Sequence, residues 1–127
     1  MINRAFHPST EILGRRLKMN LMKNISKGEI ISLKDQITYQ DGQFVSKTLA
    51  QNEAVSMTLF SFAKGEEIGT HQSQGDALVI CLDGVGKCTI DDTEYVLHEG
   101  ESLVMPAGHP HSVFGEDDFK MLLMVVF

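Results

Sequence analysis

The sequence predicts a single all-β domain, folded as a barrel or a sandwich. From Gly42 onward, short runs rich in β-branched and aromatic residues alternate with turn residues at fairly even spacing. This rhythm favours a barrel or sandwich over a helical or βαβ fold. No strong helix signal appears among these runs. The length of 127 residues fits one domain that buries well over half of the surface its unfolded chain would expose.

The expected strands follow one another in order, separated by turn compositions such as Asp83-Gly84, Asp91-Asp92, Glu99-Gly100 and residues 115–118. They span residues 30–33, 44–49, 54–62, 77–82, 87–90, 94–97, 102–105, 111–114 and 119–127.

The last strand carries information about assembly. Residues 121–127 read MLLMVVF and are apolar on both faces, as expected of a strand that is covered on both sides. The N-terminal extension or a second subunit must cover its outer face, because an exposed apolar patch of that size invites association. We therefore expect a homodimer whose interface includes residues 121–127 or the extension.

The chain divides into an N-terminal extension or docking arm, residues 1–22, and a barrel domain, residues 23–127. Within the arm, Pro8-Ser9-Thr10-Glu11 resembles a helix start, although Gly14 interrupts the apolar stripe that follows. We expect the arm to dock on its own barrel or on a partner.

Composition narrows the function classes. A formal net charge of −6 argues against a nucleic-acid partner, because such proteins concentrate positive charge. No apolar run is long enough to cross a bilayer, and the N-terminus lacks the apolar centre of a secretory signal, so we expect a cytoplasmic protein without a membrane partner. Cys81 and Cys88 lie in strand-like segments and are expected to be free, buried thiols.

Two stretches carry the chemistry, GEEIGTHQSQGDALVICLDG at residues 65–84 and GESLVMPAGHPH at residues 100–111. They resemble the two motifs of the cupin superfamily, the first in a degenerate form. The matching positions are Gly65, His71 and Gly84 in the first motif and Gly100, Pro106, Gly108 and His111 in the second. The resemblance covers roughly the C-terminal two-thirds of the chain. It implies a double-stranded β-helix, a jelly-roll barrel with a ligand site in its mouth.

The resemblance also implies a metal site, in altered form. Ser73 stands where the family has a second histidine and Asp76 where it has a glutamate. The remaining set, His71, Asp76 and His111, is the facial arrangement of non-haem iron sites and also suits manganese, nickel or zinc. The alternative interpretation is a site without metal, in which the histidines are hydrogen-bonded in a polar barrel mouth and Asp76 closes a turn beside Gly75.

Strand periodicity adds a geometric expectation. Alternation places Leu78, Ile80 and Leu82 on the same side as Asp76, so we expect the carboxylate to point inward above an apolar small-molecule pocket. His109 is a substitute ligand or a loop residue. His98 and His7 are expected at the surface. For Met57, Met105, Met121 and Met124, core packing is favoured over a role as pocket lining.

Two functions from different classes remain open. The first is a small metal-dependent enzyme that acts on a modest apolar or carboxylated molecule at His71, Asp76 and His111. The second is a non-catalytic binding or sensing module that has kept the barrel and lost part of the ligand set.

Overall fold

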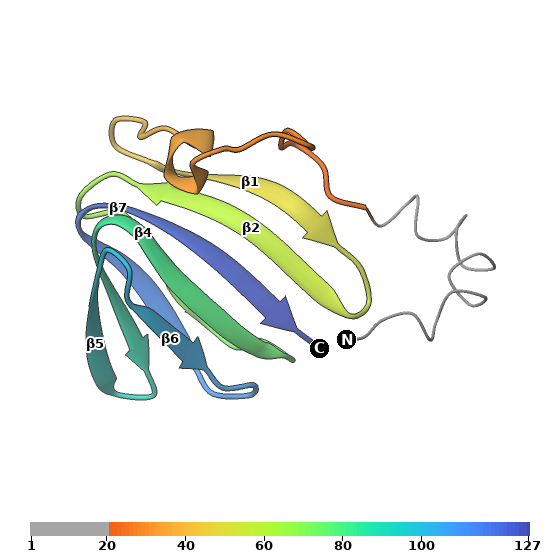
Figure 1. Ribbon diagram of the computed structural model, residues 1–127. Coiled ribbons are helices and arrows are strands. Elements are labelled where there is room, and N and C mark those ends of the chain that lie inside the picture. Colours follow the sequence, from red (N-terminus) through yellow and green to blue (C-terminus); the bar gives the residue numbers. More distant parts are fainter. Residues whose placement is uncertain (1–20) are drawn as a thin grey trace.

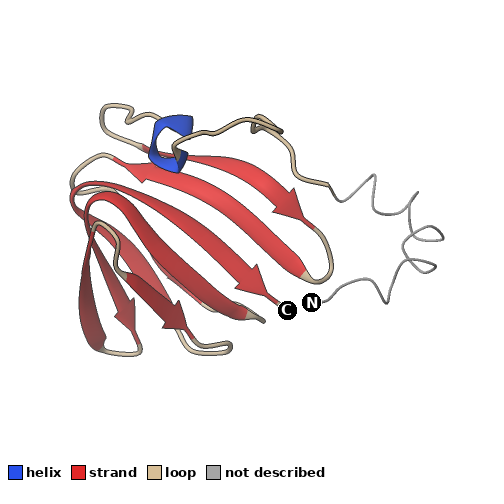
Figure 2. Cartoon of the chain, viewed as in Figure 1, coloured by secondary structure: helices blue, strands red, loops and turns tan. Residues whose placement is uncertain are grey.

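The computed structural model describes residues 21–127, which form one sheet of seven antiparallel strands that curls into a barrel (Figures 1 and 2). The expectation of an all-β fold is confirmed. The strands are β1 (Phe44–Gln51), β2 (Val55–Phe62), β3 (Glu67–His71), β4 (Asp76–Ile90), β5 (Thr93–His98), β6 (Ser102–Met105) and β7 (His111–Val126). Their order is β1-β2-β7-β4-β5, with β3 paired to β7 and β6 paired to β4.

Helix is confined, within residues 21–127, to the 3-10 turn η2 (Leu33–Gln36). No helix in this part of the chain is long and apolar enough to cross a membrane. The expected helix start at residues 8–11 and the surface position of His7 lie outside the described residues, as does nearly all of the proposed arm.

Two expected turns are wrong, because the chain passes through them as strand. Residues 77–82 and 87–90 belong to the single strand β4, and residues 111–114 and 119–126 belong to β7. The pairing of β4 with β7 shifts register between Cys81 and Asp83 and again between Gly84 and Gly86. Such bulges bend a strand sharply without ending it. The turn-like residues therefore mark a corner of the barrel.

The corner requires glycine at position 84. Gly84 has a φ of 74°, a left-handed conformation that side chains rarely adopt. A Cβ atom there would lie 1.6 Å from the carbonyl oxygen of Asp118 on β7. The two strands can approach this closely only because residue 84 has no side chain.

The strand expected at residues 30–33 is absent, and the structure contains a strand, β3, that the sequence does not predict. Residues 30–33 pair with no strand; Ile30 is fully exposed, and Leu33 begins η2. Strand β3 went unrecognised because Ile68 is the one large apolar residue in its sequence EIGTH. Strand β3 forms by pairing with β7, which its own sequence does not reveal.

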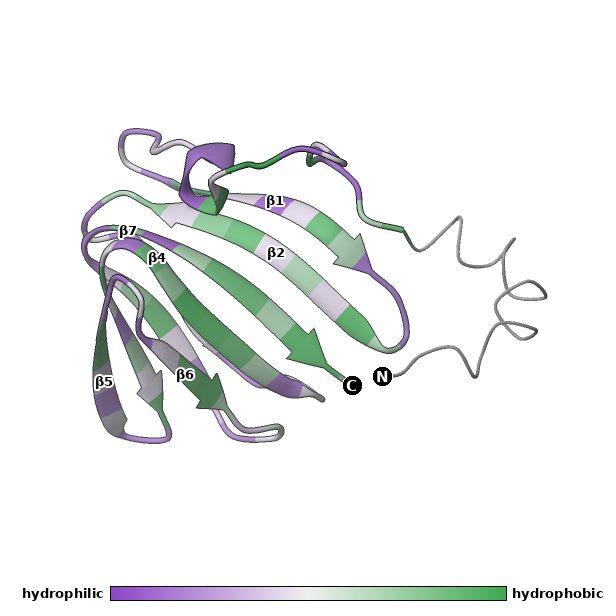
Figure 3. Cartoon of the chain, viewed as in Figure 1, coloured by the Kyte–Doolittle hydropathy of each residue, from purple (hydrophilic) through white to green (hydrophobic). Residues whose placement is uncertain are grey.

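Hydrophobic residues run along much of β2, β4 and β7 (Figure 3). Their buried side chains form two clusters, one on each face of the sheet. The inner cluster fills the barrel and consists of Phe62, Ala77, Val79, Cys81, Cys88, Ile90, Leu97, Met105, Val113, Phe119 and Met121. The outer cluster joins Leu49, Leu59 and Leu122 on the strands to Ile25, Leu33 and Ile37, with Ile80 and Leu82 packed against it.

The outer face of β7 is thus covered in part by residues 25–37 of the same chain, coloured orange in Figure 1. Lys120 on β7 binds this segment, because its Nζ donates a hydrogen bond of 2.6 Å to the carbonyl of Lys34. The same Nζ lies 4.9 Å from the centroid of the Tyr39 ring. The Tyr39 hydroxyl donates to Asp83 at 2.6 Å. Burial and this carboxylate raise the pKa of Tyr39. Further along β7, Val126 remains exposed, so the homodimer stays a prediction.

The expectation for the two cysteines is confirmed. Cys81 and Cys88 are free and buried in the inner cluster. Burial raises the pKa of Cys81 to about 11 and that of Cys88 to about 12. Both are packing residues, because a thiol with a raised pKa forms little of the nucleophilic thiolate.

Candidate functional site

His71 and His111 lie side by side at one end of the barrel. His71 ends β3, His111 begins β7, and the two residues are direct partners in the antiparallel pairing. Their ring centroids are 4.4 Å apart and the ring planes meet at 71°. On its other side His111 pairs with Ile90, a member of the inner cluster. Since directly opposed residues share a face, both imidazoles stand on the inner face of the sheet.

The two rings differ in their exposure to solvent. His111 is 3% exposed, whereas His71 is exposed. The pair therefore connects the inside of the barrel with solvent.

Backbone carbonyls select one tautomer of each ring. Nδ1 of His71 lies 2.9 Å from the carbonyl oxygen of Gly69, and Nδ1 of His111 lies 3.2 Å from that of His109. A carbonyl oxygen only accepts, so we assign the proton of each ring to Nδ1. In the neutral rings the lone pair is then on Nε2, the atom left free to bind a ligand or an ion.

The pKa of His111 is lowered. Its largest cause is burial, which disfavours the charged ring, and the neighbouring His71 adds to it, while the hydrogen bond to the His109 carbonyl opposes both. Burial therefore favours the neutral ring, whose Nε2 lone pair can bind a metal ion or accept a hydrogen bond.

Asp76 does not join the two histidines. It is exposed at the start of β4, and its Oδ1 accepts a hydrogen bond of 2.9 Å from the amide of Ala107. The residue that points inward here is Ala77, which is 1% exposed. The expectation that alternation turns Asp76 into the cavity is wrong. The geometry resembles the alternative interpretation, in which Asp76 closes a loop.

Because Ala77 and not Asp76 faces inward, the residues expected to line a pocket lie on the outer face of β4. Leu78, Ile80 and Leu82 are half-buried, and the last two pack in the outer cluster, not beneath a polar mouth. Within residues 21–127, no group of three or more His, Cys, Asp and Glu side chains is placed to hold a metal ion. What the structure assembles is a pair of imidazoles.

The other candidate residues occupy varied positions. His98 is exposed as expected, 3.3 Å from Glu101. Nδ1 of His109 lies 2.9 Å from a carboxylate oxygen of Asp91, a residue that the sequence places in a turn and for which it indicates no role at the site. No feature of the sequence beyond the turn composition indicated this contact.

The methionines divide by face. Met105 and Met121 are fully buried in the inner cluster, which confirms core packing for these two. Met57 and Met124 are half-buried, and Met57 packs against the outer cluster.

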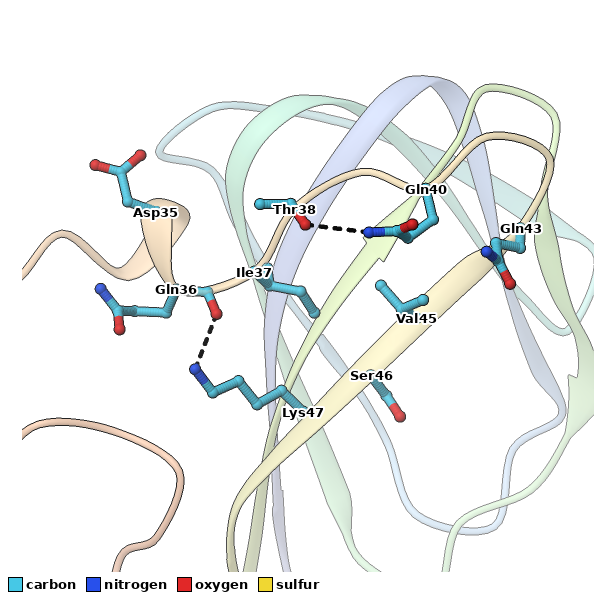
Figure 4. Close-up of a pocket in the computed structure, with 9 residues that line it drawn as sticks. All are labelled: Asp35, Gln36, Ile37, Thr38, Gln40, Gln43, Val45, Ser46 and Lys47. Atoms are coloured by element: carbon cyan, nitrogen blue, oxygen red, sulfur yellow. Dashed lines mark hydrogen bonds between the residues drawn. The ribbon is translucent and has the colours of Figure 1, made fainter.

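A groove of about 560 Å³ lies elsewhere on the molecule, between the segment that follows η2 and β1 (Figure 4). Its lining is mainly amides and hydroxyls, and neither histidine of the pair belongs to it. Two of its own groups are already paired, since Lys47 donates to the carbonyl of Gln36 and Gln40 donates to Thr38. The groove is thus separate from the imidazole pair.

Comparison with known proteins gives a consistent result. The model of the cupin domain matches residues 58–127. A conserved protein of unknown function from Streptococcus pyogenes, SPY1581, is 41% identical, with 85% of this chain and 95% of that chain covered and a TM-score of 0.82. A cupin superfamily protein from Desulfitobacterium hafniense is 33% identical, with coverages of 84% and 97% and a TM-score of 0.80.

A third structure, a cupin 2 conserved barrel domain protein from Leptotrichia buccalis, is 44% identical, with a TM-score of 0.75. The match covers 76% of this chain but 47% of that one, so the relative has a further portion outside the match. Among functionally curated proteins, none matches the sequence.

Proposed function

Because this chain belongs to the cupin superfamily, we propose that it binds a divalent metal ion through Nε2 of His71 and His111 and presents that ion to a small-molecule ligand. The observation that carries the proposal is the pairing of two imidazoles on the inner face, 4.4 Å apart, each with Nδ1 engaged by a carbonyl. Metal-binding histidines in proteins usually have their second nitrogen held in this way.

The donor set fits some metals better than others. Two neutral imidazoles suit zinc, nickel or iron, whereas manganese prefers oxygen ligands. With two protein ligands, the remaining coordination positions are open to water or to a ligand, and the metal would supply Lewis acidity there. The chain's own residues supply orientation, since the carbonyls of Gly69 and His109 hold the two rings in one tautomer.

The arrangement of the site supports one of the two function classes more than the other. A non-catalytic binding or sensing module is favoured, because no carboxylate in residues 21–127 completes a group of three with the imidazoles, and general acid–base chemistry needs positioned groups of matched pKa. A metal-dependent enzyme acting on a small apolar or carboxylated substrate is the second candidate, supported by the open coordination positions.

Metal analysis tests the proposal directly. We expect one zinc or nickel ion per chain in calorimetric titrations, and loss of binding in His111→Ala and His71→Ala. His111→Gln serves as a second variant that fills the buried space, and circular dichroism checks the fold of each protein. His98→Ala is the matched control, because its imidazole is exposed and lies on β5, which pairs with β4 and with neither β3 nor β7. Unchanged metal content in the His111 variants would rule the proposal out.

A further inference from the structure

The orientation of the His111 ring depends on a carbonyl group in the loop that precedes β7. The carbonyl that accepts from Nδ1 of His111 is that of His109, and His109 lies in the connection between β6 and β7, residues 106–110. If this loop moves, the acceptor moves, and nothing else in the described hydrogen bonds fixes the tautomer of His111.

Four further hydrogen bonds to residues outside the loop hold it in place. The amide of Ala107 donates to Asp76 at 2.9 Å, and the amide of Gly108 donates to the carbonyl of Ser73 at 2.9 Å. At the far end, Nδ1 of His109 donates to the carboxylate of Asp91 at 2.9 Å. The anchors come from three places outside the loop, namely the start of β4, the residues before it and the turn after it.

Asp91 is the first residue of the two-residue turn between β4 and β5. Its φ is 55°, in the left-handed region that few non-glycine residues occupy. Its own amide donates to the carbonyl of Pro110 at 2.8 Å, so backbone and side chain grip the loop together. Aspartate is one of the residues that tight hairpin turns accept at a positive φ, so the turn between β4 and β5 accounts for this conformation.

We propose that Asp76 and Asp91 are positioning residues, which clamp loop 106–110 so that the His109 carbonyl keeps the proton of His111 on Nδ1 and leaves Nε2 free. The consequence for metal affinity rests on the proposed function above, but the effect on the ring does not. This assigns Asp76 a role different from that of a ligand. Its carboxylate acts on the site through the Ala107 amide.

The test compares deletion with conservative replacement in the full chain. Asp76→Ala removes the acceptor and Asp76→Asn restores one. Asp91→Gly removes the side chain without adding backbone strain, because glycine tolerates a positive φ, and Asp91→Asn keeps an acceptor in a residue that tolerates this region. Asp92→Gly is the matched control from the same turn, whose side chain makes no hydrogen bond within residues 21–127.

The primary readout is the nitrogen-15 spectrum of the histidine rings, which distinguishes Nδ1–H from Nε2–H without any metal. We expect a single Nδ1–H form of His111 in the unmodified protein and in Asp92→Gly. Mixed tautomers should appear in Asp76→Ala and Asp91→Gly, and the asparagine variants should restore the single form. Zinc affinity should fall about 10–100-fold in the deletion variants, the usual effect of removing an outer-shell partner.

The outcomes separate this inference from the proposed function. If the unmodified protein binds no zinc but the tautomer shifts as expected, the positioning role stands and the metal proposal fails. An unchanged His111 tautomer in both folded deletion variants would overturn the positioning role, whatever the zinc affinity. Failure of the asparagine variants to restore the ring would also overturn it, because the restored acceptor is the group that the clamp requires.

Discussion

Replacing Gly84 with alanine should destabilise the protein through two separable effects. The residue has a φ of 74°, and the left-handed conformation costs a non-glycine residue about 1–2 kcal/mol. In addition, the new Cβ atom would lie 1.6 Å from the Asp118 carbonyl oxygen. Because the obstacle is backbone, β4 and β7 must separate at this corner, where Gly84 pairs with Phe119.

Separation of the strands sets the size of the second effect. Loss of two ladder hydrogen bonds at about 0.5–1.5 kcal/mol each, added to the conformational strain, gives a total of about 2–5 kcal/mol. That is a large fraction of the stability of an ordinary domain, which is about 5–15 kcal/mol. The free energy of unfolding is measured by urea denaturation followed by circular dichroism.

Gly100→Ala provides the matched control for the strain. Gly100 has a φ of 89°, but a Cβ atom there would meet nothing within 4 Å. Gly100→Ala should therefore reduce the free energy of unfolding by the conformational strain alone, about 1–2 kcal/mol. If Gly84→Ala costs no more than Gly100→Ala, the close approach of the two strands does not limit this position, and the reasoning is refuted.

Three further predictions concern protonation, reactivity and assembly. The free energy of unfolding should decrease as the pH falls below about 6.5, because His111 takes up a proton there in the unfolded chain but not in the folded one, where burial lowers its pKa. His111→Gln should flatten this dependence on pH. An identical pH profile in this variant would contradict the prediction. Cys81 and Cys88, with their pKa values raised to about 11 and about 12, should react with a thiol reagent at pH 8 only after denaturant is added, so rapid modification of the folded protein would disprove their burial. Sedimentation at micromolar concentration should show a homodimer that Met124→Lys dissociates, whereas a monomeric unmodified protein would exclude the interface.

Much of the fold could be predicted because it depends on local pattern. Short β-rich runs with evenly spaced turn residues indicated an all-β domain, and the glycine, proline and histidine positions indicated a cupin barrel. The resemblance to the cupin motifs also implied that His71 and His111 face the same cavity. Burial of the two cysteines could be inferred from the apolar residues around them.

The direction of Asp76 could not be predicted, for a reason of periodicity. Side chains along a strand alternate with a period of two, so a shift of one residue exchanges the faces. Residues 77–82 are all apolar, and alternation in such a run cannot show which face is inner. The structure decided it, by packing Ala77 and Val79 in the inner cluster and Ile80 against the outer one.

The sequence by itself determined which residues favour strands and where the chain can bend. Only the tertiary structure decided that Asp83-Gly84 is a bend within a strand, because the partner strand that continues the ladder lies far along the chain. It also decided that Asp91 reaches His109. Contacts between residues distant in sequence depend on how strands pair and curl, and that information is not contained in any single segment.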